Sequence, residues 1–210
     1  MSTQAKNHPP AGKCITVDPI RSMDDVAEVA EYLEPHKRNH TMFLLGVNTN
    51  LRAGDLLKLT MGDIDWFMGK IHVKEGKTKK NRAIDLSMDM LEMLVAYCNP
   101  DRKYRKDELL FPSSKGGGLI TVSSFNNMVK KWCRDCDIRG NHGSHTLRKT
   151  WAYMQHNVFK TDMAVISQEM NHSSMKVTFR YLGITDEERR VMFSHFIGKR
   201  TTGRKRGAKC

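Results

Sequence analysis

The sequence of 210 residues lacks the features of a secreted or membrane-spanning protein. It has no apolar run of about 18 residues and no signal peptide, so no segment is predicted to cross a bilayer as a helix. Its five cysteines are odd in number and have no framework spacing, which argues against a secreted disulfide fold. These absences predict an intracellular, cytoplasmic protein.

Acidic residues are also scarce relative to basic ones. The chain has 23 Asp and Glu against 35 Lys and Arg, a net charge of +12 and a pI of about 9.6. The excess is clustered in "KEGKTKKNR" (74–82), "DRKYRK" (101–106) and "KRTTGRKRGAK" (199–209). Clustering favours a polyanionic partner, with DNA, RNA and acidic membrane surface as candidates in that order, over a basic surface that serves only solubility. RNA binding is disfavoured because the stacking platforms expected for single strands are missing.

Metal and cofactor chemistry has little support in the sequence. Cys133 and Cys136 form a C-x-x-C pair, but the pattern "FNNMVKKWCRDC" places both on a helix, and no second Cys or His pair with zinc spacing follows nearby. Packing in the core is the favoured role for these thiols. We therefore predict neither a metal site nor a cofactor.

The hydrophobic pattern indicates more helix than strand. Val26, Val29, Ala30 and Leu33 form a helical stripe behind Ser22, a good N-cap. Further helices are predicted at 40–50, 51–60, 88–98, 122–136, 145–158, 161–170, 174–182 and 186–197. Two short strands, 71–74 and 82–86, flank a basic turn, and 109–120 contains a strand fragment. The expected fold class is α+β, mainly α-helical with a small antiparallel β-sheet.

Side chains that could take part in catalysis occur in a recognisable order along the chain. They are Arg52, Lys77, His145, Arg148, His172 and Tyr181. The motifs around them read "LRAGDL", "HTLRKT" and a tyrosine nine residues after "NH". Together they resemble the tyrosine recombinases, also called the phage integrase family, over about residues 20–198. Asp55, Lys149 and the pair Met170–Asn171 depart from frequent family residues without removing a catalytic group.

The resemblance implies a metal- and ATP-independent reaction on double-stranded DNA. Tyr181 would attack the phosphodiester and form a 3′-phosphotyrosine, and His145 would accept its proton. Arg52 and Arg148 would hold the non-bridging oxygens, whose charge grows in the transition state. Lys77 would protonate the leaving oxygen, and His172 would hydrogen-bond the phosphate. Five further basic residues are predicted to contact DNA: Lys74, Lys79, Lys80, Arg82 and Lys149.

Helix geometry adds one constraint on this site. Positions 172 and 181 would lie on opposite faces of a continuous helix, at 3.6 residues per turn. A helix must therefore begin after His172, and Ser173 or Ser174 is a suitable cap. His72, His142, His156 and His195 are taken as bystanders.

The expected organisation is a disordered lead (1–13), a catalytic domain (14–198) and a basic tail (199–210). Family members usually carry an additional helical domain that closes a clamp around DNA, and only 51 residues precede Arg52. The apolar face of 186–197 is expected to support self-assembly on DNA. Accessory DNA-binding proteins are expected as further partners. No membrane partner is expected. Two other interpretations stay open: a type IB topoisomerase-like nicking-closing enzyme, and a non-catalytic DNA-binding regulator with the same fold.

Overall fold

The structure, a computed structural model, describes residues 17–77, 79–99, 101–171 and Thr178. Its helices are α1 (Met23–Leu33), α2 (Lys37–Thr49), α3 (Ala53–Leu56), the 3₁₀ turn η1 (Met61–Asp63), α4 (Met88–Cys98), α5 (Val122–Asp135), α6 (Thr146–Asn157) and α7 (Met163–Glu169). Its strands are β1 (Ile64–Asp65), β2 (Lys70–Lys74) and β3 (Asn81–Asp85). Within this part of the chain, no helix combines the length and apolar character that a bilayer crossing requires.

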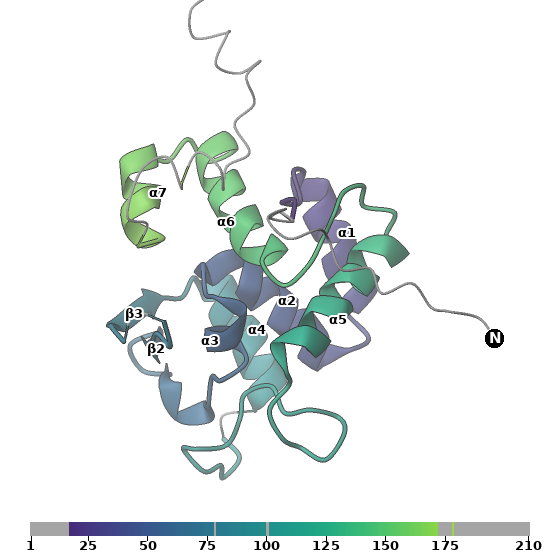
Figure 1. Cartoon of the computed structure of the whole chain (residues 1–210). Helices are drawn as coiled ribbons and strands as arrows, with labels where there is room; N and C mark the ends of the chain where they lie inside the picture. Colours follow the sequence, from purple (N-terminus) through teal and green to yellow (C-terminus); the bar gives the residue numbers. More distant parts are fainter. Residues whose placement is uncertain (1–16, 78, 100, 172–177, 179–210) are drawn as a thin grey trace, which may run out of the picture.

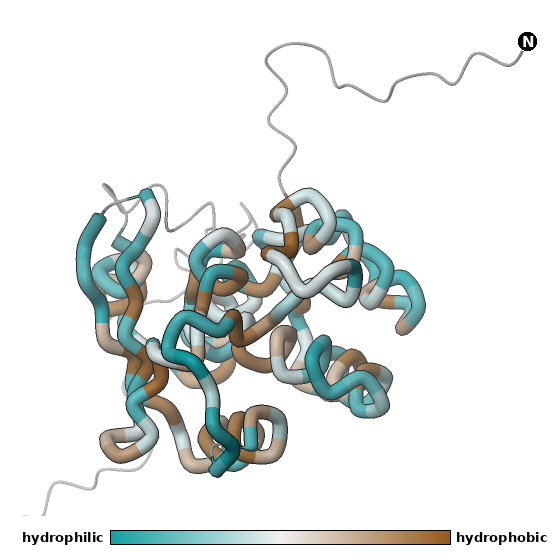
Figure 2. Tube along the Cα trace, turned by 90° about the horizontal axis from the view of Figure 1, so that it is seen from below, coloured by the Kyte–Doolittle hydropathy of each residue, from teal (hydrophilic) through white to brown (hydrophobic). Residues whose placement is uncertain are grey.

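Helix α2 is the centre of the helical layer, because α1, α3, α4 and α6 all pack against it. The sheet lies to one side of α2, while α1 and α5 lie to the other side (Figure 1). Fully buried Phe43 of α2 and Phe125 of α5 each meet Trp132 edge-on, with ring centroids 6.2 and 6.1 Å apart. Figure 2 shows hydrophobic segments gathered toward the interior and hydrophilic ones on the outer turns. The contact between Phe43 and Trp132 joins α2 to α5 in the core.

The sheet is antiparallel, in the order β1-β2-β3. Residues 70–74 pair with 85–81, and residues 64 and 65 pair with 71 and 70. Alternate residues of β2, Ile71 and Val73, are buried, as the two-residue period of a strand requires. One face of the hairpin therefore packs toward the helices, and the basic turn connects the two strands between Lys74 and Asn81.

Most predicted elements are present with small shifts in their ends. Helix α2 begins at Lys37, three residues earlier than predicted, and Asp162 rather than residue 161 marks the start of α7 as its N-cap. Ser22 caps α1 by accepting from the backbone N–H groups of Asp24 and Asp25. The predicted helices at 174–182 and 186–197 lie outside the described residues, apart from Thr178.

One strand prediction was wrong, and one short strand was not predicted. Residues 109–120 form no strand, only isolated bridges from Leu109 to Thr60 and between Pro112 and Leu119. Strand β1 was missed because two residues are too short to show alternation. The hairpin nevertheless lies where it was predicted, with ends at Lys74 and Asn81 around the basic turn.

A close contact between α2 and α6 yields a prediction about stability. A Cβ at Gly46 would lie 2.6 Å from Leu147 Cδ1 and 3.3 Å from its Cβ, whereas a Cβ at Gly54 of α3 would meet only Val122 Cγ2 at 3.9 Å. We expect Gly46→Ala to lower the free energy of unfolding by about 1–3 kcal/mol through overpacking. Gly54→Ala, the matched control, should leave it unchanged or slightly raised.

Urea denaturation of the two variants beside the unaltered chain measures this difference. Equal midpoints for Gly46→Ala and Gly54→Ala would show that α6 does not press on α2 as described.

Candidate active site

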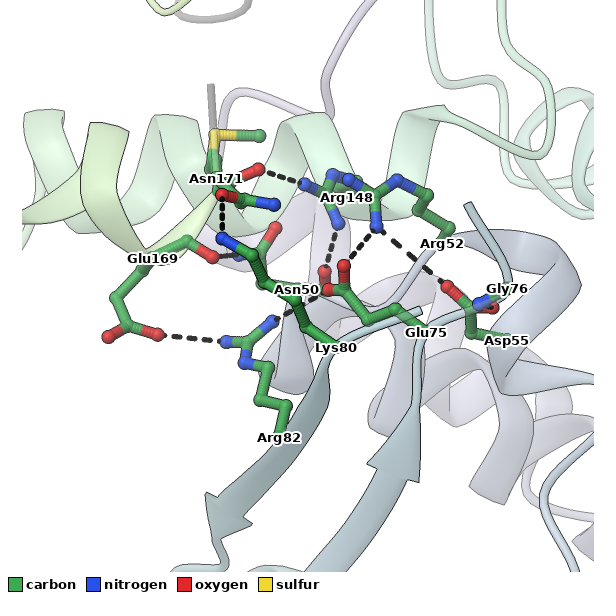
Figure 3. A network of polar contacts seen from close by, with 11 residues as sticks. Asn50, Arg52, Asp55, Glu75, Gly76, Lys80, Arg82, Arg148, Glu169 and Asn171 are labelled. Carbon is green, nitrogen blue, oxygen red and sulfur yellow. Dashed lines mark hydrogen bonds and ion pairs between the residues drawn. The ribbon is translucent and has the colours of Figure 1, made fainter. Parts of the chain in front are cut away.

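Arg148 occupies the first turn of α6 and is only 3% exposed. Its Nη1 donates to the carbonyl of Asn50 at 2.6 Å, and its Nη2 donates to the carbonyl of Met170 at 2.8 Å (Figure 3). A buried charge needs such partners, and two bonds from one guanidinium fix the orientation of its plane. Arg148 thereby joins the end of α2, the start of α6 and the end of α7.

Asn50 can present its carbonyl because of its own backbone conformation. It ends α2 in the left-handed region, with φ of 56°, and is fully buried. Its side-chain Nδ2 donates to the carbonyl of Glu169 at 3.0 Å. Asparagine tolerates this conformation better than most residues, and it is a common way to end a helix. The sequence run "NTNLR" therefore turns the chain sharply and brings Arg52 close to Arg148.

Arg52 is the N-cap residue of α3 and contacts two carboxylates. Its Nη1 lies 2.7 Å from Glu75 Oε2 and 3.9 Å from Asp55 Oδ2 (Figure 3). Asp55 Oδ1 also accepts from the backbone N–H of Gly76 at 2.9 Å. The i, i+3 ion pair with Asp55 is thus real, but Glu75 is the closer partner. These contacts fix the base of the β2–β3 turn against α3.

Lys77 is exposed in the turn between β2 and β3. The turn closes through the backbone, since Lys79 N–H donates to Glu75 O at 2.8 Å and Glu75 N–H donates to Lys80 O at 2.9 Å. Lys79 itself has a left-handed backbone, with φ of 59°. The anchored base and exposed tip allow Lys77 to reach over the neighbouring site.

His145 is the N-cap residue of α6, three residues before Arg148. Although part of the side chain reaches solvent, the protein around the imidazole lowers its pKa below the usual value, chiefly by desolvation. The cations that lower this pKa further are Arg148, Lys149, Arg52 and Lys77, in that order. Four predicted site residues from three separate stretches of chain therefore act on one imidazole, and each of them disfavours its protonated form.

The residues predicted to contact DNA fall into two groups. Lys74 and Lys79 are exposed on the hairpin. Lys80, also exposed, places its Nζ 3.4 Å from Asn171 Oδ1. By contrast, Arg82 pairs with Glu169 at 2.9 Å and approaches Glu75 at 4.0 Å. Lys149, also in the second group, is only 8% exposed. In the described structure these last two side chains are engaged by the protein itself, so a structural role competes with DNA contact.

His172 and Tyr181 lie outside the described residues, as does the helix start predicted after His172. Their predicted roles stay predictions. The described range 101–171 ends at Asn171, which directly follows Met170, whose carbonyl accepts from Arg148. The chain positions next to His172 are thus tied to the site.

The cysteines of α5 lie in the hydrophobic core, as predicted. Cys133 is 1% and Cys136 7% exposed. Burial raises the pKa of the Cys133 thiol to about 12, which disfavours the thiolate that metal binding or redox chemistry needs. In the part of the chain that the structure describes, no group of His, Cys, Asp and Glu side chains is arranged to hold a metal ion.

Glu75 is the site residue that sequence reasoning missed. It is the single acid in the basic run 74–82 and is only 5% exposed. An isolated acid within a cationic segment indicates a specific internal partner, because a buried carboxylate needs one. That signal was available, but its partner Arg52 lies 23 residues away and could not be read from the pattern.

Comparison with known proteins bears on the family of the chain. The model of the phage integrase family matches residues 21–188, which is more than half of the chain. The probable integrase/recombinase YoeC of Bacillus subtilis (strain 168) is 34% identical over 185 residues, covering 87% of this chain and 98% of that protein. A tyrosine recombinase of Pseudothermotoga lettingae is 26% identical over 167 residues, covering 79% of this chain and 56% of that protein.

Solved structures give the same fold. The crystal structure of XerA recombinase superposes with a TM-score of 0.69 at 23% identity, covering 89% of this chain and 66% of that chain. The catalytic domain of bacteriophage HP1 integrase superposes with a TM-score of 0.58 at 18% identity, covering 84% of this chain and 94% of that domain. The predicted fold class, mainly helical with a small antiparallel sheet, is confirmed. The resemblance read from the scattered motifs is confirmed with it: the chain belongs to the phage integrase family.

Proposed function

We propose that this chain is a site-specific DNA recombinase that cleaves and rejoins strands through a covalent 3′-phosphotyrosine at Tyr181. The observation that carries the proposal is the placement of Arg52 and Arg148 beside His145, where these cations and two lysines lower the pKa of the imidazole. Such a site suits a phosphodiester, because the cations attract its negative charge while the imidazole stays able to accept a proton. YoeC, named as a probable integrase/recombinase and matched over 98% of its length, supports the same function.

The reaction balances without a metal or a cofactor. The Oη–phosphorus bond of Tyr181 forms as the bond from phosphorus to the 5′-oxygen breaks, and His145 takes the phenolic proton. Arg52 and Arg148 hold the non-bridging oxygens with guanidinium groups that stay charged at any working pH. Lys77 gives a proton to the departing 5′-oxygen, and His172 hydrogen-bonds the phosphate. A second 5′-hydroxyl reverses these steps and reseals the strand.

The partner of the proposed enzyme is double-stranded DNA. The net charge of +12 and the exposed lysines of the hairpin supply contacts to phosphates. The solved structures with this fold include XerH recombinase bound to its difH substrate. We further propose that residues 14–198 form the catalytic domain, with a lead at 1–13 and a basic tail at 199–210. Self-assembly on DNA through 186–197, and accessory DNA-binding proteins, complete the proposal.

One experiment tests the activity directly. The chain is incubated with a pool of nicked duplexes of randomised sequence, and covalently captured DNA is recovered and sequenced. Recombination predicts capture of a defined sequence and, on plasmids that carry two copies of it, joined sites. Relaxed supercoils without joined sites would indicate a nicking-closing enzyme instead, and binding without capture would indicate a DNA-binding regulator.

The first prediction from this function concerns the nucleophile. Tyr181→Phe should abolish the covalent adduct and leave the dissociation constant for duplex DNA nearly unchanged, because only the phenolic oxygen is lost. Adduct formation is read on denaturing gels and binding by fluorescence anisotropy. An adduct that persists in Tyr181→Phe would assign the nucleophile to another residue.

The second prediction separates the chemical role of Arg52 from its structural one. Arg52→Ala should slow cleavage by about 10² or more, the scale for losing one transition-state donor. It also leaves the buried carboxylate of Glu75 without its closest cation, which destabilises the fold. Combining it with Glu75→Gln removes that charge, so the double variant should regain stability but not activity.

Single-turnover cleavage and thermal denaturation of both variants provide the measurement, with Glu75→Gln alone as the control. Chelators should change nothing. Recovery of cleavage in the double variant, or loss of cleavage in EDTA that Mg²⁺ restores, would overturn the role of Arg52 as a phosphate ligand.

The third prediction concerns the leaving oxygen. Lys77→Ala should slow cleavage more than Lys79→Ala, a matched loss of charge in the same turn, because Lys77 alone of the two acts on the imidazole of His145. A bridging 5′-thio substrate needs little protonation and should restore the rate of Lys77→Ala. If it does not, the general acid is a different residue.

A further inference from the structure

The short segment before α1 makes backbone hydrogen bonds to the part of the chain that carries His145 and Arg148. Asp18 N–H donates to Asn141 O at 2.7 Å, and Asn141 N–H donates back to Asp18 Oδ2 at 2.8 Å. Two residues on, Ile20 N–H donates to Thr150 Oγ1 of α6 at 2.8 Å, in a fully buried contact. Residues 18–20 thus hold points on both sides of His145, although the sequence separates them by more than 120 residues.

The adjoining side chains extend this attachment. The guanidinium of Arg21 lies 5.3 Å from the ring centroid of Tyr153 on α6, a cation–π contact. Ile20 is part of the hydrophobic core, so its burial supplies most of the attachment energy. The polar contacts of Asp18 then set direction, because hydrogen bonds require a specific geometry.

The loop 140–145 has no helix or strand of its own to position His145. Three of its backbone N–H groups instead donate to side-chain oxygens from three different elements. Asn141 N–H donates to Asp18 Oδ2, Gly143 N–H to Thr146 Oγ1 at 3.0 Å, and Ser144 N–H to Asn126 Oδ1 at 3.0 Å. The Gly143 bond is buried and the Ser144 bond is partly buried, so these donors need partners within the protein, while the Asn141 bond lies at the surface and adds a directional contact.

Close packing leaves the loop little room to find another path. A Cβ at Gly143 would lie 2.4 Å from Asn126 Oδ1 and 3.2 Å from Val17 Cγ1. Gly140, with φ of 132°, adopts a conformation that side-chain-bearing residues rarely reach, and a Cβ there would lie 3.3 Å from both Cβ and Oδ2 of Asp18. The segment before α1 therefore closes over the loop at two glycines.

From these contacts we infer that Asp18 is a positioning residue for His145: its carboxylate and backbone hold the loop that delivers the imidazole to the cationic site. The inference rests on the proposed function for its catalytic consequence, but not for its structural content. Asn126 supports the same loop from α5. Neither residue touches the reacting phosphate, and both act through the backbone of 140–145.

The experiment compares Asp18→Ala with Asp18→Asn, which keeps an acceptor oxygen but loses the charge. Val29→Ala is the control for general destabilisation, since it creates a cavity in the core at α1 without touching the loop. The first readout is the pKa of His145 by NMR on histidine-labelled full-length chain, with its signal identified by its absence in His145→Gln. This readout needs neither DNA nor activity.

The sign of the pKa change distinguishes positioning from charge. Removal of the Asp18 anion alone would lower the pKa of a nearby imidazole. Release of the loop would instead raise the pKa of His145 toward its ordinary value, because the ring gains water and moves away from the cations of Arg148, Lys149, Arg52 and Lys77. We expect a raised pKa in Asp18→Ala, an unaltered or slightly lowered pKa in Asp18→Asn, which keeps the loop but loses the charge, and the unaltered value in Val29→Ala.

The second readout is single-turnover cleavage of the duplex captured by the unaltered chain. Asp18→Ala should slow cleavage by about 10- to 100-fold, as a displaced catalytic group does. Asp18→Asn should remain within about threefold, because its oxygen can still accept the Asn141 N–H. Val29→Ala should cleave at the unaltered rate below its melting temperature.

Three results would overturn the inference: an unchanged or lowered His145 pKa in Asp18→Ala, equal effects of Asp18→Ala and Asp18→Asn, or equal effects of Asp18→Ala and Val29→Ala. If the unaltered chain captures no DNA, the proposed function fails while the titration still decides the positioning role. A raised pKa in Asp18→Ala alone would then confirm the role of Asp18 in holding the loop.

Discussion

The burial of the Arg148 guanidinium is the constraint on which the rest of the site depends. A charge at 3% exposure is tolerable only with partners, and two of them are the main-chain carbonyls of Asn50 and Met170. These carbonyls come from the ends of α2 and α7, where helices leave carbonyls without intrahelical bonds. The charge therefore holds three helices in one arrangement.

Arg52, the second cation of the site, is held by carboxylates instead of carbonyls, and these offset part of the positive charge. Arg52 contacts Glu75 and Asp55, so two buried or nearly buried carboxylates offset part of the repulsion among the clustered cations. The same carboxylates fasten the β2–β3 turn, since Asp55 accepts from Gly76 N–H. Electrostatic balance and placement of Lys77 thus depend on one set of contacts. Without these carboxylates, repulsion among the cations would destabilise the site whenever no phosphate is bound.

Sequence reasoning located the elements and the motif residues because their signals are local. The stripe of α1, the cap at Ser22 and the spacing of His145 and Arg148 all fall within one or two turns of chain. It missed the pairs of Arg52 with Glu75, Arg82 with Glu169 and Asp18 with Asn141, which span 23, 87 and 123 residues. Such pairs are set by the tertiary fold. Arg82 shows the consequence, since composition suggested only a DNA contact and the fold adds the exposed carboxylate of Glu169 as a partner.

The position of His145 shows why a catalytic group can lie outside regular structure without losing precision. Helices and strands fix their residues through repeating backbone bonds, whereas the loop before α6 is fixed by side-chain oxygens from Asp18, Asn126 and Thr146. Each oxygen belongs to a different element, so any shift of one element relative to the others changes the loop. A rigid helix beginning at Thr146 then carries that placement on to Arg148. The two groups that must meet one phosphate are consequently positioned by the same anchored stretch of chain, one from its loop and one from its first helical turn.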